Sequence, residues 1–240
     1  RSFQIKLEER REQFLGKKPI NIGNQIKRNM RPIVTFGAPR IEEDEIRAVV
    51  ATLRSGWISK GPRVTEFEAA FQKYQGTKHA VAVNSCTAGL HLALIAAGIG
   101  KGDEVITTPL TFCATANVIV HVGAKPVFAD VRRDTMNLDS EAVERKIGRR
   151  TKAIIPVHLA GRPCDMDSIL TLARKHKLTV ISDCAHAIEA TYHGKKVGSL
   201  GDIAAFSFYA TKNLTTGEGG MITTNRADFA RKMAVDSLHG

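Results

Sequence analysis

The stretch TKAIIPVHLAGRPCDMDSILTLARKHKLTVISD, residues 151–183, decides the fold class. It begins with an apolar run at 151–158 and ends with another at 178–183, and neither run alternates with polar residues. Between them, residues 165–177 carry apolar side chains at helical spacing behind Asp165, which fits a helix N-cap. Apolar strands without alternation are covered on both faces. The stretch therefore predicts a strand, a helix and a second, parallel strand.

The same alternation extends in both directions from this unit. Before it, β-rich runs at 79–84, 103–108 and 125–131 alternate with helical patterns at 87–98, 112–123 and 139–148. After it, strand patterns at 202–209 and 219–225 lie close enough to be hairpin-related or antiparallel. Two helical patterns come first, RIEEDEIRAVVATLRSG (40–56) and RVTEFEAAFQKYQG (63–76). The predicted fold is α/β, a mostly parallel doubly wound sheet that binds ligands at the carboxyl ends of its strands.

The length of 240 residues suits one large domain with a substantial core. Residues 1–33 are basic and have only a ragged apolar pattern, so we expect an N-terminal extension there and the domain at 34–240. No apolar run is long enough to span a bilayer, and the first residues are too charged for a secretory signal. We therefore expect a cytoplasmic protein without a membrane partner.

The chain is basic, with 35 Lys and Arg against 24 Asp and Glu and a formal net charge of +11. Such a charge suits nucleic acid, but no nucleic-acid-binding motif is visible, and phosphorylated small molecules suit it equally. The four cysteines form no CxxC pair, which argues against zinc or a redox pair and favours free thiols. The DCAH stretch (183–186) could offer metal ligands but lacks further ones nearby, so we expect no metal site.

Polar and aromatic residues follow several of the predicted strands. The turn NSCTA (84–88) leads into a helix, where free backbone N–H groups can bind an anion. The same small polar residues are also typical of an ordinary helix N-cap without a ligand. Phe112 could stack on a planar ligand or lie in the core. Asp183 ends an apolar strand and needs a partner if it is buried, with His186 three residues later. Lys212 follows a buried strand in FSFYATKNLTTGEGG (206–220), and burial would lower its pKa.

Together these residues offer a phosphate cradle, a stacking ring, an acid and an amine at the ends of one sheet. Pyridoxal phosphate requires this combination: the lysine forms a Schiff base, the acid keeps the pyridine nitrogen protonated, and the helix N-terminus binds the phosphate. We therefore expect this cofactor.

The chain also resembles the DegT/DnrJ/StrS family of sugar aminotransferases, which have the fold-type I aspartate aminotransferase architecture. The resemblance runs in order over residues 32–240 and is most specific in the acid–His and lysine blocks. The matching stretches are SGWISKGP, FEAAF, AVAVNSCTAGLHLAL, GDEVITTPLTFCATANVIVHVGAKPVFADV, TKAIIPVHLAG, DCAHAIEA and FSFYATKNLTTGEGGMITTN.

The resemblance implies a role for each matching residue. Lys212 would form the Schiff base and move the proton between substrate and cofactor carbons, and Asp183 would pair with the pyridinium nitrogen. His186 would approach the cofactor hydroxyl, and Phe112 would stack on the ring. The phosphate would be held by Cys86, Thr87, Ala88 and Ser207. The sugar side would be lined by Gly56, Trp57, Ile58 and Ser59, with Glu218 in a nearby loop.

The resemblance also implies the reaction and the assembly. Transamination would move an amino group from an amino acid, with glutamate as the expected donor, to a nucleotide-linked keto-sugar for polysaccharide biosynthesis. Family dehydratases have His in place of the lysine, so Lys212 argues for transamination. Cys86 stands where many relatives have Gly, and a backbone contact tolerates that change. Members are homodimers with shared active sites and continue into a smaller C-terminal domain. That domain is not in this sequence, so we expect the sequence to be a fragment of a longer protein.

Two other functions remain open on the sequence alone. The same fold supports other pyridoxal phosphate reactions, such as lyase or dehydratase chemistry. A non-catalytic regulator could also have kept the fold and used its basic arm to bind nucleic acid. The sequence does not distinguish which sugar, nucleotide or ring carbon would be involved.

Overall fold

The computed structural model describes residues 37–238 of the chain. The extension predicted at residues 1–33 lies outside the described residues. Within residues 37–238, no helix is long and apolar enough to cross a membrane.

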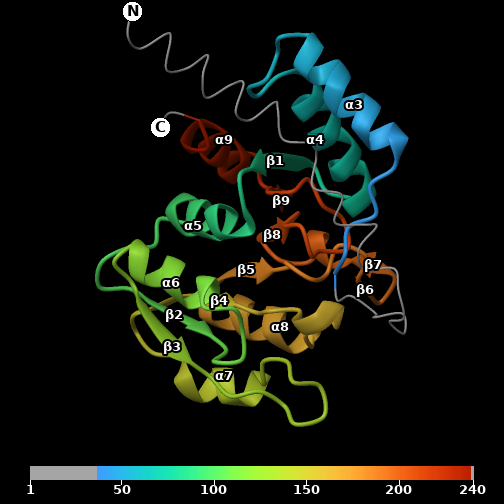
Figure 1. Ribbon diagram of the computed structural model, residues 1–240. Coiled ribbons are helices and arrows are strands. Elements are labelled where there is room, and N and C mark those ends of the chain that lie inside the picture. The colour runs from blue at the N-terminus through green and yellow to red at the C-terminus, as the bar shows by residue number, and fades with distance from the viewer. Residues whose placement is uncertain (1–36, 239–240) are drawn as a thin grey trace, which may run out of the picture. The chain divides into compact units, whose positions relative to one another are not determined.

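A seven-stranded sheet forms the centre of this domain, with strand order β1-β9-β8-β5-β4-β2-β3 (Figure 1). The strands β3, β2, β4, β5 and β8 run parallel to one another, and β9 runs antiparallel to both β8 and β1. The predicted α/β class, with a mostly parallel sheet and an antiparallel pair near its C-terminal end, is therefore confirmed. The strands are β1 His79–Val83, β2 Glu104–Thr107, β3 Lys125–Phe128, β4 Thr151–Ile155, β5 Thr179–Asp183, β8 Ile203–Ser207 and β9 Gly220–Thr224.

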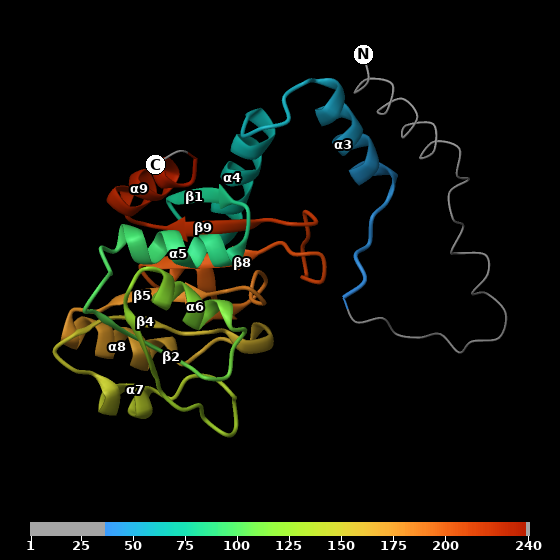
Figure 2. The ribbon, with the colours of Figure 1, turned by 60° about the vertical axis from the view of Figure 1, so that its left-hand side comes forward.

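Helices cover both faces of the sheet, as the two views show (Figures 1 and 2). One core cluster packs α5, α6 and α9 against one face, and two further clusters pack α7, α8 and α4 against the other. Alternate residues of β8 enter opposite clusters, Ile203 and Ala205 on one side and Ala204 and Phe206 on the other. This arrangement explains why the strand is apolar throughout. The helices are α3 Glu43–Arg54, α4 Pro62–Gln75, α5 Cys86–Ala96, α6 Ala114–His121, α7 Ser140–Lys146, α8 Met166–His176 and α9 Ala227–Asp236.

The helix ends follow local sequence signals. Asp165 caps α8, as predicted, by accepting a hydrogen bond from the Ser168 N–H at 3.2 Å. Ser85 caps α5 in the same way through the Ala88 N–H at 3.1 Å. The small hairpin of β6 Thr191–Tyr192 and β7 Lys195–Lys196 and the helix α9 were not predicted.

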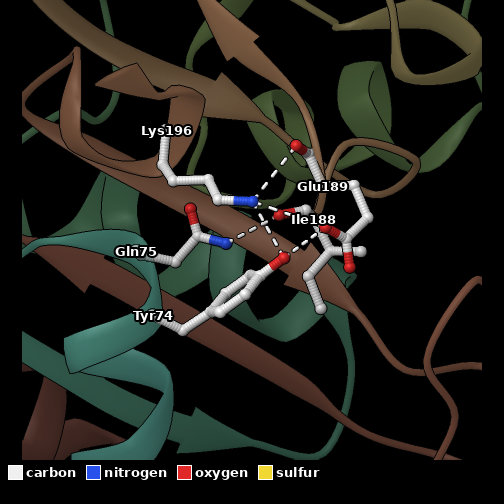
Figure 3. A network of polar contacts seen from close by, with 5 residues as sticks. All are labelled: Tyr74, Gln75, Ile188, Glu189 and Lys196. Carbon is white, nitrogen blue, oxygen red and sulfur yellow. Dashed lines mark hydrogen bonds and ion pairs between the residues drawn. The ribbon is translucent and has the colours of Figure 1, made fainter. Parts of the chain in front are cut away.

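A polar network fixes the end of α4 to the segment that follows β5 (Figure 3). The buried Gln75 side chain donates to the Ile188 carbonyl at 2.9 Å. Beside it, the Lys196 ammonium donates to the Tyr74 hydroxyl at 2.8 Å and pairs with Glu189 at 3.4 Å. The network holds the chain just after His186 in place, next to the carboxyl ends of the strands.

The helix α3 keeps its predicted amphipathic pattern, but its apolar face is exposed. None of its residues is buried by the part of the chain that the structure describes. The expectation of a helix at this position is confirmed. Its apolar side chains, however, do not join the core at residues 37–238; they are Ile46, Val49, Val50 and Leu53.

Candidate active site

A cavity of about 570 Å³ opens at the carboxyl ends of the parallel strands. Its wall comes from the N-terminus of α5, the turn before α6, the segments after β4 and β5, and the loop between β8 and β9. Parallel strands leave this edge of a sheet open because each strand is followed by a turn into its helix. The cavity brings together residues that lie more than a hundred positions apart in the sequence.

Asp183, the last residue of β5, lies at the floor of this cavity and is only 6% exposed. One carboxylate oxygen, Oδ2, accepts the Thr115 hydroxyl at 2.8 Å, and Oδ1 accepts the Ala185 N–H at 3.1 Å. The Cys86 thiol lies 3.9 Å from Oδ1. Burial raises the pKa of Asp183, while the Thr115 hydroxyl, the Ala185 N–H and the Lys212 charge oppose that rise.

Lys212 lines the same cavity from the loop between β8 and β9 and is half-buried, as predicted. Its amine forms no hydrogen bond or ion pair with any residue between 37 and 238. Burial lowers the pKa of Lys212, and the nearby Asp183 and Cys86 only partly offset this effect. A larger share of the amine is therefore neutral, and nucleophilic, at physiological pH than for a surface lysine.

The N-terminus of α5 forms a third wall of the cavity through Ser85, Cys86 and Thr87. Within the described range, the backbone N–H groups of Cys86 and Thr87 have no hydrogen-bond acceptor. Free N–H groups at a helix N-terminus bind anions. Ala88, which was also expected to contact the phosphate, does not line the cavity, and its N–H is bonded to the Ser85 side chain.

Phe112 stands at the mouth of the cavity and leaves 77% of its surface exposed. The alternative interpretation of Phe112 as a core residue is therefore wrong. His186 and Ser207 also line the cavity, as does Glu218 in the loop before β9. Burial and the Lys212 charge lower the pKa of His186.

The stretch expected on the sugar side lies apart from this cavity. Gly56, Trp57, Ile58 and Ser59 line a separate small hollow after α3, together with Ser55. Trp57 and Ile58 are exposed, by 57% and 75%. Within one chain, the described residues therefore do not bring this stretch to Lys212 and Asp183.

The structure adds cavity residues that sequence reasoning missed. Thr111, His158 and Tyr209 line the wall, and Thr115 supports Asp183 from behind it. His158 is 1% exposed, and burial lowers its pKa to about 4. Its Nδ1 accepts the Cys164 N–H at 3.1 Å. The one sequence feature that could have indicated His158 as a site residue is its position at the end of the apolar run 151–158.

This arrangement suits a ligand with four features: a phosphate, a planar group, a positive charge and a carbonyl carbon. The free N–H groups of α5 suit a phosphate, and the exposed Phe112 ring suits a planar group. Asp183 suits a cation at the cavity floor, and the Lys212 amine can attack a carbonyl carbon.

Comparisons with known proteins agree with this chemistry. The sequence model of the DegT/DnrJ/EryC1/StrS aminotransferase family matches residues 39–240. The chain is 57% identical over 205 residues to the spore coat polysaccharide biosynthesis protein SpsC of Bacillus subtilis, covering 85% of this chain and 53% of that protein. It is 54% identical over 203 residues to the GDP-perosamine synthase of Caulobacter vibrioides, covering 84% of this chain and 55% of that protein.

A solved structure gives a similar result in three dimensions. The PLP form and the PMP form of Spr1654 from Streptococcus pneumoniae superpose with a TM-score of 0.83 at 40% identity. The superposition covers 86% of this chain and 58% of that one. The chain thus spans about half the length of the curated relatives that it matches.

Proposed function

Because the chain belongs to the DegT/DnrJ/EryC1/StrS aminotransferase family, we propose that the protein transfers an amino group from an amino acid to a nucleotide-linked keto-sugar, with pyridoxal phosphate as cofactor. The observation that carries this proposal is the meeting of Lys212, Asp183 and the α5 N-terminus in one cavity. Each of the three supplies a group that this cofactor needs.

The residues present fit pyridoxal phosphate. The two free N–H groups of α5 match the phosphate, and the buried Asp183 carboxylate matches a protonated pyridine nitrogen. At Gly220, where β9 begins, a Cβ atom would lie 2.5 Å from the Ser85 carbonyl carbon, so the chain leaves no room for a side chain beside this cradle. The PLP and PMP forms of Spr1654 support the same cofactor.

When bound, pyridoxal phosphate supplies an electron-withdrawing ring that stabilises negative charge on the carbon next to the transferred nitrogen. Lys212 would hold the cofactor covalently through its amine, with the aldehyde oxygen leaving as water. Once the amine of the substrate has displaced it, its free Nζ would carry the proton between substrate carbon and cofactor carbon. Asp183 would keep the ring nitrogen protonated. Phe112 would cover the ring and help exclude water, while Ser207, Thr87 and Cys86 would hold the phosphate. His186 would approach the hydroxyl group of the cofactor.

The substrate class rests on the relatives. The name of GDP-perosamine synthase points to an amino sugar on a nucleotide, and that of SpsC to polysaccharide biosynthesis. We propose a nucleotide-linked keto-sugar as the amino acceptor of this protein, glutamate as the donor, and a homodimer as the active assembly. Glu218, which lines the cavity, would contact the donor or the sugar.

The first experiment uses the full-length protein and one amino donor. Wild-type protein loaded with pyridoxal phosphate is expected to be yellow, to lose that absorbance with glutamate and to release 2-oxoglutarate. The Lys212→Ala variant is expected to lose roughly a thousandfold or more of this activity. Lys195→Ala, at an exposed lysine of the β6–β7 hairpin, serves as the control and is expected to match wild type.

The acceptor is identified by a second measurement. A panel of nucleotide-linked keto-sugars is incubated with glutamate, and mass spectrometry detects replacement of the keto oxygen by an amino group. Failure of every amino donor to convert the bound cofactor would favour lyase or dehydratase chemistry instead. A full-length protein that binds no pyridoxal phosphate would contradict the proposal outright.

A further inference from the structure

Thr115 lies in the first turn of α6 and is fully buried directly behind Asp183. Its hydroxyl lies 2.8 Å from Asp183 Oδ2 and 2.8 Å from the Thr111 hydroxyl. A third oxygen, the Phe112 carbonyl, lies 3.2 Å away. The turn that presents Phe112 to the cavity is therefore tied to the acid at the cavity floor through a single side chain.

Counting protons fixes the direction of these bonds. The Thr115 hydroxyl has one hydrogen and cannot donate to all three oxygens. An ionised Asp183 can only accept, so Thr115 must donate to Oδ2, and the Thr111 hydroxyl must then donate to Thr115. With an ionised carboxylate, the two hydroxyls form one ordered chain of hydrogen bonds that ends on Oδ2. A charge-assisted hydrogen bond of this kind favours the ionised acid.

The other groups around Asp183 do not replace this bond. The Ala185 N–H and the Cys86 thiol of α5 both approach Oδ1, so Thr115 is the donor to Oδ2. Lys212 and His186 act on Asp183 through their charge, and their own pKa values are lowered by burial. Cys184, the next residue, is buried, and burial raises its thiol pKa, so it stays a neutral thiol and adds no negative charge beside Asp183.

We propose that Thr115, supported by Thr111, is a positioning residue that holds Asp183 ionised and fixed in orientation for the ring nitrogen of the cofactor. The inference rests on the proposed function for the identity of that nitrogen. Its first part, the effect of Thr115 on Asp183, concerns this chain alone and can be measured without cofactor.

The test compares three variants of the full-length protein with wild type. Thr115→Val removes the hydroxyl at nearly constant volume, and Thr115→Ser restores it. Thr223→Val is the matched control, because Thr223 is equally buried but donates to the Gly198 carbonyl at 2.8 Å. Urea unfolding and circular dichroism show whether each variant is folded.

The first readout is the pKa of Asp183 in cofactor-free protein, followed by carbon NMR of labelled aspartate and assigned with Asp183→Asn. Thr115→Val is expected to raise this pKa by about one pH unit, a tenfold change in proton affinity. Thr115→Ser and Thr223→Val are expected to keep the wild-type value. An unchanged pKa in Thr115→Val overturns the inference.

The second readout is the dissociation constant of pyridoxal phosphate, measured by absorbance titration. Thr115→Val is expected to bind about tenfold more weakly than wild type, with recovery in Thr115→Ser. Equal affinity of wild type and Thr115→Val overturns the positioning role toward the cofactor. Failure of wild type itself to bind overturns the proposed function instead, while the NMR comparison still decides whether Thr115 controls Asp183.

Discussion

Phe112 shows at the residue scale how exposure marks a binding side chain. An apolar ring with 77% of its surface exposed contributes little to the core. Because Phe112 lines the cavity, a bound ligand could stack on its ring. Phe112→Ala is expected to change the free energy of unfolding by less than about 0.5 kcal/mol. The same change should weaken pyridoxal phosphate binding about tenfold, because a stacked ring contributes roughly 1 kcal/mol beyond its buried area.

The measurement is an absorbance titration of cofactor-free protein together with urea unfolding. Phe112→Trp is expected to keep the wild-type affinity. Phe128→Ala, an exposed phenylalanine of β3 outside the cavity, is the control. Equal cofactor affinity in wild type and Phe112→Ala would contradict the stacking role.

His158 links the cavity wall to the pH dependence of stability. Burial lowers its pKa from 6.5 to about 4. Between these two pH values, His158 is therefore protonated in the unfolded chain and neutral in the folded chain. Its contribution to stability is therefore complete above about pH 6.5 and is lost as the pH falls toward 4, by up to about 3 kcal/mol. Asp183 acts in the opposite direction, because burial raises its pKa.

A difference between variants isolates the histidine. His158→Asn keeps an acceptor for the Cys164 N–H but cannot titrate, and it is expected to lose less stability than wild type between pH 7 and pH 4.5. Unfolding in urea at several pH values measures this slope. His176→Asn, at an exposed residue of α8, should leave the slope as in wild type, and equal slopes in all three proteins would refute the prediction.

The side chains of the site differ in how far the sequence reveals them. Asp183 and Lys212 were predictable because a charged residue at the end of an apolar strand, or in the loop that follows one, needs a partner if it is buried. Thr115 was not, since a threonine inside a helical pattern carries no sign of the carboxylate it faces across 68 positions. Whether Phe112 is exposed also depends on what packs around it, and the local sequence does not contain that information.

Gly220 sets the distance between two elements. The first residue of β9 passes so close to the start of α5 that a Cβ atom would lie 2.5 Å from the Ser85 carbonyl carbon and 2.7 Å from the Cys86 nitrogen. These are backbone atoms and cannot rotate away. Gly220→Ala is expected to destabilise the fold by about 1–3 kcal/mol and to displace the N–H groups of the cradle, which weakens cofactor binding.

Thermal or urea unfolding and the cofactor titration together measure both effects. Gly148→Ala is the control, because the nearest atom to its Cβ would be the end of the Glu104 side chain at 4.0 Å. If Gly220→Ala kept wild-type stability and affinity, the close approach of β9 and α5 would not matter for either property.

The elements themselves were predicted well where the pattern was long. Every predicted strand from 79 to 225 is present, because uninterrupted apolar runs flanked by helical patterns have few other solutions. The β6–β7 hairpin was missed because two residues per strand give no periodicity. The exposure of α3 could not be predicted either, since amphipathicity shows that a face can be buried but not by what.

At the scale of the whole molecule, the separation of Trp57 from the cavity bears on the proposed homodimer. Within one chain, Trp57 and its neighbours do not line the cavity that contains Lys212. If they line the sugar side of an active site, that site must be the cavity of the partner subunit. Trp57→Ala and Lys212→Ala are then each expected to be inactive alone. Mixed and reassembled, they should recover up to about a quarter of wild-type activity, because half of the dimers are mixed and each has one intact site.

Activity assays on mixtures refolded together, with sedimentation to confirm dimers, make this measurement. Each variant refolded with itself is the control. No recovery in dimers that have exchanged subunits would place Trp57 outside the partner's site.

The pairing of Ser207 with Gly220 at the base of the loop that carries Lys212 has a consequence for proteolysis. Both ends of the loop are held by neighbouring strands, while most residues from Tyr209 to Glu218 are exposed, so the loop is open to a protease although its base is fixed. Trypsin cuts after unmodified lysine, and the covalently loaded Lys212 would no longer be a substrate. Cleavage between Lys212 and Asn213, monitored by mass spectrometry, should therefore be fast without cofactor and slow with it. The rate of tryptic cleavage would then report the fraction of the protein that carries the cofactor on Lys212.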